Sequence, residues 1–380
     1  MKVIVGIDAS RSRSGGATAH LIGILKESNP TEFGIVKLHI WSYKKHLNNL
    51  PDYEWIIKHN PPELENSLLI QLWWQYFKFP KELKRAQCDI VLNLDAGSIC
   101  PFHPSITMSR DMLSFEEGEM KRFNLGFSKL RLLVLKYVQI YSLKRSDGAV
   151  FLTKYASEII QKYTGKLKNY KLIPHGVSNS FKQETDGGNW NNDERGEIKC
   201  LYVSNVALYK HQWEVVKAIS ILRKKNYAVS ILFAGGGTGP AQKKFELELN
   251  IVDPDRNFTT QIEFVNHNEV PRLLSETDIF IFASSCENMP NTLLEAMSGG
   301  LPIACSNRGP MPEVLLDGGE YFNPEDAMSI ADAIETLLKE KELRIRKATK
   351  AKLLAEQYSW ERCGKETWEY LVETLKTISK

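Results

Sequence analysis

The chain is poor in cysteine and has no long hydrophobic run. Its six cysteines among 380 residues form no Cys-x-x-Cys pair, which argues against a structural zinc site and a disulfide framework. No window reaches the roughly 18 consecutive apolar residues of a transmembrane helix. The apolar run at residues 3–7 is short and lacks a cleavage site, so it is typical of a buried strand rather than a signal peptide. We therefore expect a cytoplasmic protein with reduced thiols.

A large excess of one charge is also missing, and so are several common catalytic motifs. The 49 basic and 46 acidic residues leave a net charge of +3, too little to indicate a nucleic-acid-binding protein. The run 235–239 does not complete the dinucleotide motif G-x-G-x-x-G, because Pro240 or Gln242 occupies the last glycine position. There is no Gly-x-Ser-x-Gly elbow, Walker loop or His-x-x-x-His spacing. Turn chemistry explains Asp253-Pro254-Asp255, and we expect no metal.

The sequence does contain a repeated alternation of short apolar runs and longer amphipathic stretches, which predicts β–α units and parallel sheets. Strands are expected at 2–7, 35–42, 90–93, 149–152, 171–174, 199–203, 230–234, 261–265, 279–282 and 302–305. Helices are expected at 17–26, 129–143, 212–223, 270–275, 291–297, 327–339 and 360–377. The predicted fold class is α/β, with two doubly wound halves of similar size.

The alternation stops between about 178 and 197, where polar, turn-forming residues dominate and only Phe181 and Trp190 are large and apolar. Such a composition is typical of a linker or a surface loop. We therefore divide the chain into an amino-terminal domain (1–178), a linker (179–197), a carboxy-terminal domain (198–358) and a last helical segment (359–380).

The loops that follow the strands are the places to look for a ligand site. In open α/β sheets, ligands bind beyond the carboxyl ends of the strands, where helix amino termini present free N–H groups. Gly15 and Gly16 precede such a helix and would let the backbone approach a ligand, but taken alone they are better explained by a simple turn. Glu287 lies in a predicted loop and Glu295, eight residues later, on the next helix. A lone glutamate there is often a capping charge, but the pair favours a functional site.

This segment resembles a known family. Residues 287–295 match the Glu-x7-Glu motif of the retaining glycosyltransferases of family 4, and residues 295–302 resemble the run that follows it. The resemblance covers essentially the whole second half, whereas the first half matches loosely, through Gly15-Gly16, the strand order and residues 172–177. It implies the GT-B fold, in which two Rossmann-like domains face a central cleft. The last helix would cross back to the first domain.

The resemblance also implies roles for single residues. Glu295 would accept the ribose hydroxyls of a nucleotide, and Glu287 would hold a hydroxyl of the donor sugar and support charge at the reacting carbon. Lys210 would neutralise the leaving diphosphate. The other implied donor-binding positions are Asn291 and Thr292, through backbone N–H groups at the diphosphate, Met289 and Pro290 in the preceding loop, and Val265 and Asn266 at the base.

Two positions depart from the family's pattern. Asn205 stands where the family usually has a second phosphate-binding arginine. Arg110 stands where many members have a histidine that touches the donor sugar; it would bind the diphosphate or a charged acceptor group, or pair with a nearby carboxylate. His103 is an alternative to Arg110, but a lone histidine is more often structural. The cation missing at Asn205 would come from Arg11, Arg13 or Arg308.

Two apolar segments of the first half leave alternatives open. Residues 129–138 mix cations with a broad apolar surface, which suits a helix that docks on a membrane. It also suits a core helix whose lysines and arginines reach solvent at its edge, and we prefer that interpretation. Residues 68–77 are rich in aromatic side chains, which suit sugar rings, but core packing is again the preferred interpretation.

These features predict a hexosyltransferase-type enzyme of polysaccharide biosynthesis. It would move a sugar from a UDP- or GDP-linked donor, its co-substrate, to a glycan or lipid-linked acceptor, retaining configuration and using neither a metal nor another cofactor. Peripheral contact with the inner membrane face belongs to this hypothesis; nucleic acid does not. Two alternatives stay open: a noncatalytic nucleotide-sugar-binding protein, which Asn205 and Arg110 favour, and a sugar-nucleotide epimerase of the same fold.

Overall fold

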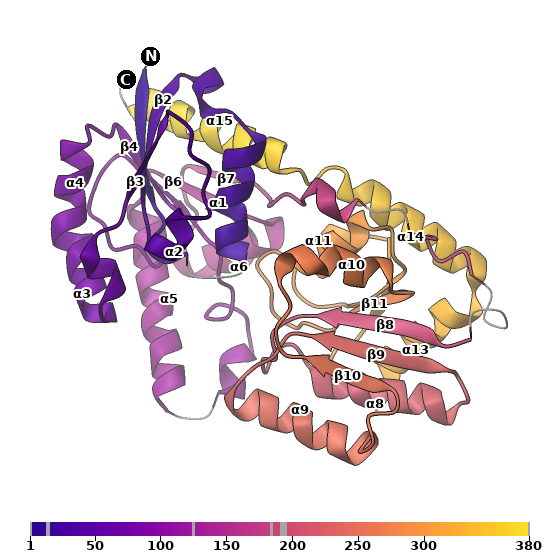
Figure 1. Ribbon diagram of the computed structural model, residues 1–380. Coiled ribbons are helices and arrows are strands. Elements are labelled where there is room, and N and C mark those ends of the chain that lie inside the picture. Colours follow the sequence, from indigo (N-terminus) through magenta and orange to yellow (C-terminus); the bar gives the residue numbers. More distant parts are fainter. Residues whose placement is uncertain (1, 13–15, 124–125, 183–184, 191–195, 379–380) are drawn as a thin grey trace. The chain divides into compact units, whose positions relative to one another are not determined.

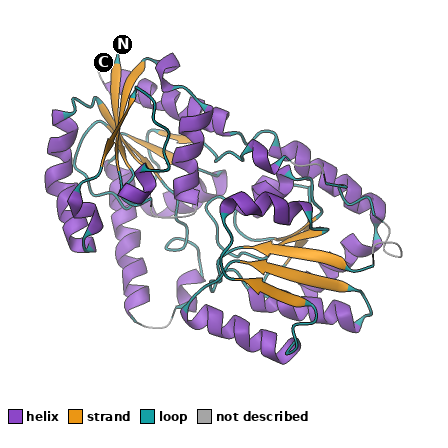
Figure 2. Cartoon of the chain, viewed as in Figure 1, coloured by secondary structure: helices purple, strands orange, loops and turns teal. Residues whose placement is uncertain are grey.

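The computed structural model describes residues 2–12, 16–123, 126–182, 185–190 and 196–378 (Figure 1). The chain forms two compact units, Met1–Gly176 with Ser359–Lys380, and Val177–Tyr358. Each unit is a sheet of parallel strands with helices packed around it (Figure 2). The last helical segment thus belongs to the first unit.

In the described part of the first unit, the sheet has seven parallel strands in the order β3-β2-β1-β4-β5-β6-β7. The strands are β1 (Val3–Asp8), β2 (Ile35–Trp41), β3 (Ile56–His59), β4 (Ile90–Asn93), β5 (Ser105–Met108), β6 (Gly148–Phe151) and β7 (Tyr170–Leu172). The helices are α1 (Gly16–Glu27), α2 (Lys44–Leu47), α3 (Leu68–Trp73), η3 (Trp74–Lys78), α4 (Phe79–Arg85), α5 (Phe127–Arg145), α6 (Lys154–Thr164) and α15 (Trp360–Ile378). The central strands β4, β5 and β6 are buried throughout, as expected when helices cover both faces.

In the described part of the second unit, six parallel strands follow the order β10-β9-β8-β11-β12-β13. The strands are β8 (Ile198–Val203), β9 (Val229–Ala234), β10 (Thr259–Ile262), β11 (Ile279–Phe282), β12 (Ile303–Ser306) and β13 (Glu320–Phe322). The helices are η5 (Asn179–Phe181), α8 (Gln212–Lys224), α9 (Gly239–Val252), η6 (His267–Glu269), α10 (Val270–Ser275), α11 (Asn291–Ser298), α12 (Met311–Leu315), α13 (Ala327–Lys339) and α14 (Lys341–Ala355). In Figure 1, α10 and α11 lie on one side of this sheet and α8 and α9 on the other.

The segment expected as a linker packs into the second unit wherever it is described. Phe181 and Trp190 are both buried. The guanidinium of Arg344, on α14, lies 3.4 Å from the centroid of the Trp190 ring and donates a hydrogen bond to the Gly188 carbonyl at 2.8 Å. The two large apolar side chains and the hydrogen bonds of Arg344 hold this segment on the domain. Residues 183–184 and 191–195 lie outside the described residues.

The last helix, α15, is fastened to the first unit by close packing. A Cβ on Gly176 would lie 2.1 Å from the backbone nitrogen of Trp360, so only glycine fits where the helix begins. Further along, the indole nitrogen of Trp368 donates to Ser28 Oγ at 2.8 Å. These contacts explain why a helix that begins 184 residues after Gly176 joins the first sheet's layer of helices.

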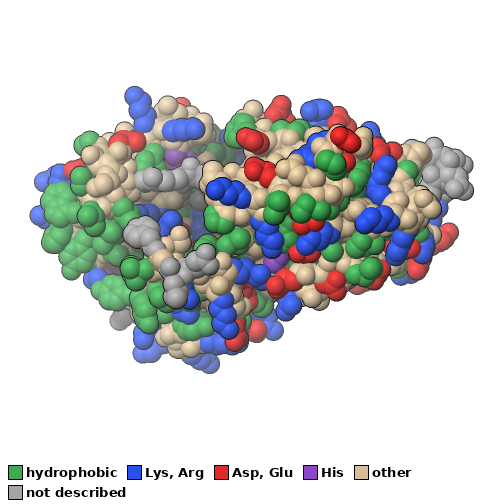
Figure 3. All heavy atoms as spheres, turned by 90° about the horizontal axis from the view of Figure 1, so that it is seen from below, with side chains coloured by type: hydrophobic (Ala, Val, Ile, Leu, Met, Phe, Trp, Pro, Cys, Tyr) green, Lys and Arg blue, Asp and Glu red, His purple; other side chains and the backbone are tan. Residues whose placement is uncertain are grey.

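The preferred core interpretation is wrong for most apolar side chains of residues 68–77. In residues 129–138 it holds only in part, because one face of the helix is exposed while Leu132 is buried and Leu133, Leu135 and Val138 are half-buried. On α5, four apolar residues one or two turns apart are between 53% and 70% exposed: Leu130, Val134, Tyr137 and Tyr141. On α3 and η3, Trp74 is fully buried, but Leu68, Leu69, Trp73 and Phe77 are exposed. Figure 3 shows hydrophobic side chains gathered on the first unit, with lysines and arginines around them. None of the described helices is long and apolar enough to cross a bilayer.

Candidate active site

The candidate site of the second unit lies where the strand order reverses. Strands β8 and β11 are hydrogen-bonded neighbours, yet β9 and β10 lie on one side and β12 and β13 on the other. At such a switch point, the loops after two adjacent strands diverge and leave room for a ligand. The loop after β8 carries Lys210, and the loop after β11 carries Glu287.

Hydrogen bonds join these two loops. The Ser285 backbone N–H donates to the Tyr209 carbonyl at 2.8 Å, and the imidazole Nε2 of His211 lies 2.9 Å from Ser285 Oγ. The Tyr202 hydroxyl, from β8, donates to the Lys210 carbonyl at 2.7 Å. Burial, reinforced by the charge of Glu287, raises the pKa of Tyr202 well above its usual value, so this phenol stays a neutral donor. The backbone around Lys210 is thereby held in place.

Lys210 and Glu287 form an ion pair across the switch point. Their side chains are only 10% and 15% exposed, so both charges are largely removed from water, and each depends on the other for compensation. Two aromatic rings flank the lysine Nζ: the ring centroid of Tyr209 lies 5.3 Å away and that of Phe282 lies 5.4 Å away. The structure therefore brings together Lys210 and Glu287, the two residues to which the resemblance assigns the leaving diphosphate and the donor sugar.

Glu295, on α11, is buried, with one carboxylate oxygen engaged and the other without a hydrogen-bond partner among the described residues. Its Oε1 lies 2.8 Å from Nε2 of His267, whereas Oε2 has no hydrogen-bond partner among the described residues. Burial raises the pKa of Glu295, and the hydrogen bond and charge of His267 oppose that rise. A buried carboxylate oxygen without a donor is costly, so this atom is suited to receive a hydroxyl from a ligand.

His267 is the residue that the sequence reasoning missed. It lies in η6, directly after Val265 and Asn266, so its place in the predicted base-binding loop was the available signal. Val265 is half-buried and Asn266 exposed, and the Asn266 N–H donates to Glu269 at 3.2 Å. That N–H is therefore already engaged, which leaves less of this loop's backbone for a base than was expected.

The remaining predicted donor-binding residues of this unit lie in the same loops. Met289 and Pro290 are buried, whereas Asn291 and Thr292, at the start of α11, are half-buried. Asn205 is exposed, and its carbonyl accepts a hydrogen bond from Gln212 Nε2 at 3.0 Å. A Cβ at Gly235 would lie 2.2 Å from the Ser204 carbonyl oxygen. Gly235 therefore allows this loop to pack closely against the loop after β8.

Arg110 belongs to the first unit, after β5. Burial lowers its pKa to about 10, although the charge of Asp95 opposes this, so the guanidinium is still protonated at neutral pH. Burial lowers the pKa values of His20 and His46, and the charge of Arg110 lowers both of them further. Gly16 begins α1, while Gly15 lies outside the described residues.

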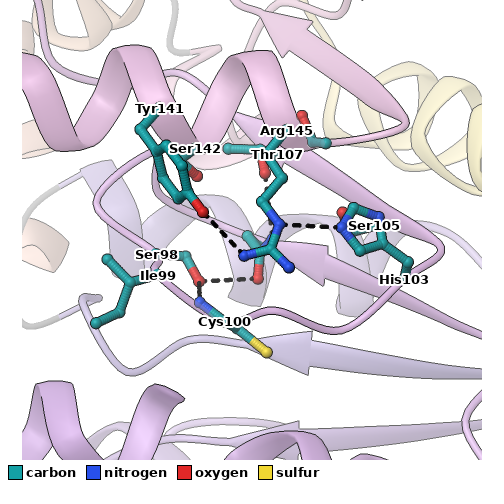
Figure 4. Close-up of a pocket in the computed structure, with 11 residues that line it drawn as sticks. Ser98, Ile99, Cys100, His103, Ser105, Thr107, Tyr141, Ser142 and Arg145 are labelled. Atoms are coloured by element: carbon teal, nitrogen blue, oxygen red, sulfur yellow. Dashed lines mark hydrogen bonds between the residues drawn. The ribbon is translucent and has the colours of Figure 1, made fainter.

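His103 lines a small polar pocket in the first unit, where its hydrogen bonds point to a structural role (Figure 4). The His103 Nδ1 lies 2.7 Å from Asp147 Oδ2, and Arg145 Nε donates to its Nε2 at 3.3 Å. Both ring nitrogens are thus used to join the 100–104 loop to the end of α5. In the second unit, Asp253 accepts three backbone N–H groups and the Thr259 hydroxyl, which confirms it as a turn residue. Within the described ranges, no three His, Cys, Asp or Glu side chains converge as a metal site would require.

Part of the chain is similar in sequence to known glycosyltransferases. Residues 189–353 match the family model described as glycosyl transferases group 1. The chain is 33% identical over 104 residues to the O-antigen chain mannosyltransferase B of Escherichia coli, which is 27% of this chain and 27% of that protein. With the next two curated relatives, the alignments cover 62% and 46% of the relative's length.

Solved structures resemble the whole chain in fold. Alr3699/HepE of Anabaena, in complex with UDP and glucose, has a TM-score of 0.72 at 16% identity and covers 100% of both chains. WaaG, a glycosyltransferase involved in lipopolysaccharide biosynthesis, has a TM-score of 0.71 at 14% identity, covering 97% of this chain and 99% of that one. The prediction of two Rossmann-like domains of the GT-B class is confirmed. Residues 189–353 are therefore similar to the glycosyl transferases group 1, and the chain as a whole has the GT-B fold of two Rossmann-like domains.

Proposed function

We propose that the protein transfers a sugar from a UDP- or GDP-linked donor to a glycan or lipid-linked acceptor, with retention of configuration and without a metal or further cofactor. The observation that carries this proposal is the buried Lys210–Glu287 pair across the switch point of the second unit. An ammonium group held at the start of a nucleotide-binding crevice is suited to a diphosphate.

The donor's groups find complementary partners in the second unit. The diphosphate would lie between Lys210 and the half-buried start of α11, where the helix dipole favours negative charge. The open oxygen of Glu295 would accept a ribose hydroxyl. Glu287, released from part of its contact with Lys210, would accept a hydroxyl of the sugar. Arg110 is proposed to act on the diphosphate or on an anionic group of the acceptor.

Transfer with retention would use the donor's own phosphate as the base. The acceptor oxygen forms a bond to the anomeric carbon on the face from which the diphosphate departs, while the bond from that carbon to the phosphate oxygen breaks. The acceptor's proton passes to the departing phosphate oxygen, so the products are the glycoside and the nucleoside diphosphate. Lys210 stabilises the charge that grows on the diphosphate, which is the largest electrostatic demand of the step.

A panel of nucleotides and nucleotide sugars tests this function. We expect UDP or GDP to raise the melting temperature, because a ligand that binds the folded state alone stabilises it. The matching nucleotide sugar should release nucleoside diphosphate only when an acceptor is added, and EDTA should leave the rate unchanged. NMR of the product should show the donor's anomeric configuration. Binding without turnover would favour a noncatalytic binder, and isomerisation without acceptor would favour an epimerase.

Peripheral membrane contact is the second part of the proposal, and α5 supports it. Its exposed apolar stripe is accompanied by five cations and no acidic residue: Lys129, Arg131, Lys136, Lys144 and Arg145. Apolar side chains between cations suit an anionic lipid surface, where the chains enter the interface and the cations meet the headgroups. This surface would keep the enzyme close to a lipid-linked acceptor.

Vesicle sedimentation tests the membrane contact. We expect binding to vesicles rich in phosphatidylglycerol and little binding to phosphatidylcholine alone. Replacing Leu130, Val134 and Tyr137 with glutamine should weaken binding to the anionic vesicles by roughly tenfold, because apolar area no longer enters the interface. The matched control replaces Leu247 and Ile251, equally exposed on α9 of the second unit, and should bind as the unaltered protein does. Equal binding by both variants would contradict the contact.

A further inference from the structure

We infer that His267 is a positioning residue for the nucleotide, holding Oε1 of Glu295 so that the carboxylate stays ionised with Oε2 open to a ribose hydroxyl. This inference rests on the proposed nucleotide-sugar site and names a residue that neither the motif nor the resemblance indicated. It starts from two atoms of one carboxylate: Oε1 is 2.8 Å from the histidine nitrogen, and Oε2, buried, has no hydrogen-bond partner among the described residues.

The surroundings make the histidine the carboxylate's charge partner. Glu295 lies on α11 with its side chain 10% exposed, while the imidazole, on η6, is 58% exposed. The charge of an ionised Glu295 must therefore be compensated at this one point, on the side that faces water. The imidazole is also placed by the Phe181 ring, whose centroid lies 5.3 Å from its own. Two neighbouring elements thus fix the orientation in which it meets Oε1.

The other charged side chains on the elements around His267 and Glu295 either pair with other groups or are exposed to solvent. On η6 itself, Glu269 accepts the Asn266 N–H. On α10, Arg272 pairs with Glu276 at 2.9 Å. On α14, Lys352 lies beside Gly300, past the end of α11, and after η5 Lys182 is exposed. Among the described groups, the pKa of each partner responds only to burial and to the other: Glu295 raises that of His267, and His267 opposes the rise at Glu295.

The sign of the pH effect follows from this pairing. A buried carboxylate protonates as pH falls, and a protonated Glu295 loses the negative charge that attracts a hydroxyl. In the unaltered protein, the hydrogen bond and charge of Glu295 raise the pKa of His267, so the imidazole carries its positive charge as pH falls and favours the ionised carboxylate. Glutamine at this position can still donate an N–H to Oε1 but supplies no charge. Loss of nucleotide affinity should therefore begin at a higher pH in His267→Gln.

Calorimetric titration with UDP and GDP between pH 6 and pH 9 tests the inference. The readout is the ratio of variant to unaltered Kd at each pH, because phosphate itself titrates near pH 6. For His267→Gln we expect a ratio within about twofold at pH 8.5 and roughly three- to fivefold weaker binding at pH 6, the upper part of the range for a partly exposed ion pair. His103→Gln, the matched control from a histidine–carboxylate pair of the first unit, should follow the unaltered protein.

A double variant distinguishes an effect of the His267 charge from a general effect on folding. In Glu295→Gln, where no carboxylate remains, adding His267→Gln should change the Kd by less than about twofold at any pH, because the coupling between the two residues is gone. A pH-independent ratio for His267→Gln, or tighter binding when His267 becomes alanine, would overturn the role of His267 alone. No binding of UDP or GDP by the unaltered protein at any pH would overturn the proposed function itself.

Discussion

Lys210→Met is expected to slow sugar transfer by about 10²- to 10³-fold while nucleoside diphosphate still binds within about tenfold of its original affinity. Removing a preorganised charge from a water-poor site has effects of this size on the transition state. The charge on the diphosphate grows only as the glycosyl bond breaks, so kcat should fall far more than KM rises. The measurement is steady-state transfer with the donor identified by the panel, with binding followed by calorimetry.

A purely structural ion pair would behave differently, and two variants separate the cases. Lys210→Met alone leaves Glu287 buried without its partner, which destabilises the fold by roughly 3 kcal/mol. Adding Glu287→Gln removes that unpaired charge, so the double variant should regain most of the stability without regaining activity. Lys225→Met, on an ion-paired lysine at the other end of α8, should transfer sugar normally. Recovery of activity in the double variant would refute the role of Lys210.

Glu295→Ala is expected to weaken UDP or GDP binding by about 10- to 100-fold, the value of one or two charge-assisted hydrogen bonds in a buried place. The loss should depend on the ribose. For the unaltered protein, the 2′,3′-dideoxy nucleotide should bind more weakly than the natural one, and in Glu295→Ala the two should bind alike. The measurement is competitive displacement of both nucleotides at one fixed pH above 8.

Two results would refute this assignment. One is a Glu295→Ala variant that still prefers the natural nucleotide over the dideoxy form. The other is an equal loss in a control, Glu313→Ala, which removes a helical glutamate from α12 of the same unit. Because Glu295 lies on α11 and is buried, melting curves of both variants must show a folded protein before affinities are compared.

The helices and strands that could be predicted from the sequence are those with a strong hydrophobic pattern. Helices α10 and α13 have the expected bounds, Val270–Ser275 and Ala327–Lys339, because apolar residues recur there at helical spacing. Other elements lack that pattern. The buried residues of α14 are three alanines and an arginine, Ala348, Ala351, Ala355 and Arg344, so no apolar stripe announces the helix. β5 was missed because it is four residues long and carries two polar side chains.

By itself, the sequence determined the alternation of strands and helices, and hence the α/β class, and it placed Lys210, Glu287 and Glu295 after particular strands. The strand order became known only from the tertiary structure, because it depends on which strands, distant in sequence, form hydrogen bonds with one another. That order makes β8 and β11 neighbours and joins Lys210 to Glu287 over 77 positions of sequence. The partner of Glu295 was likewise decided there: His267 carries no motif, and its proximity to a buried oxygen arises from packing.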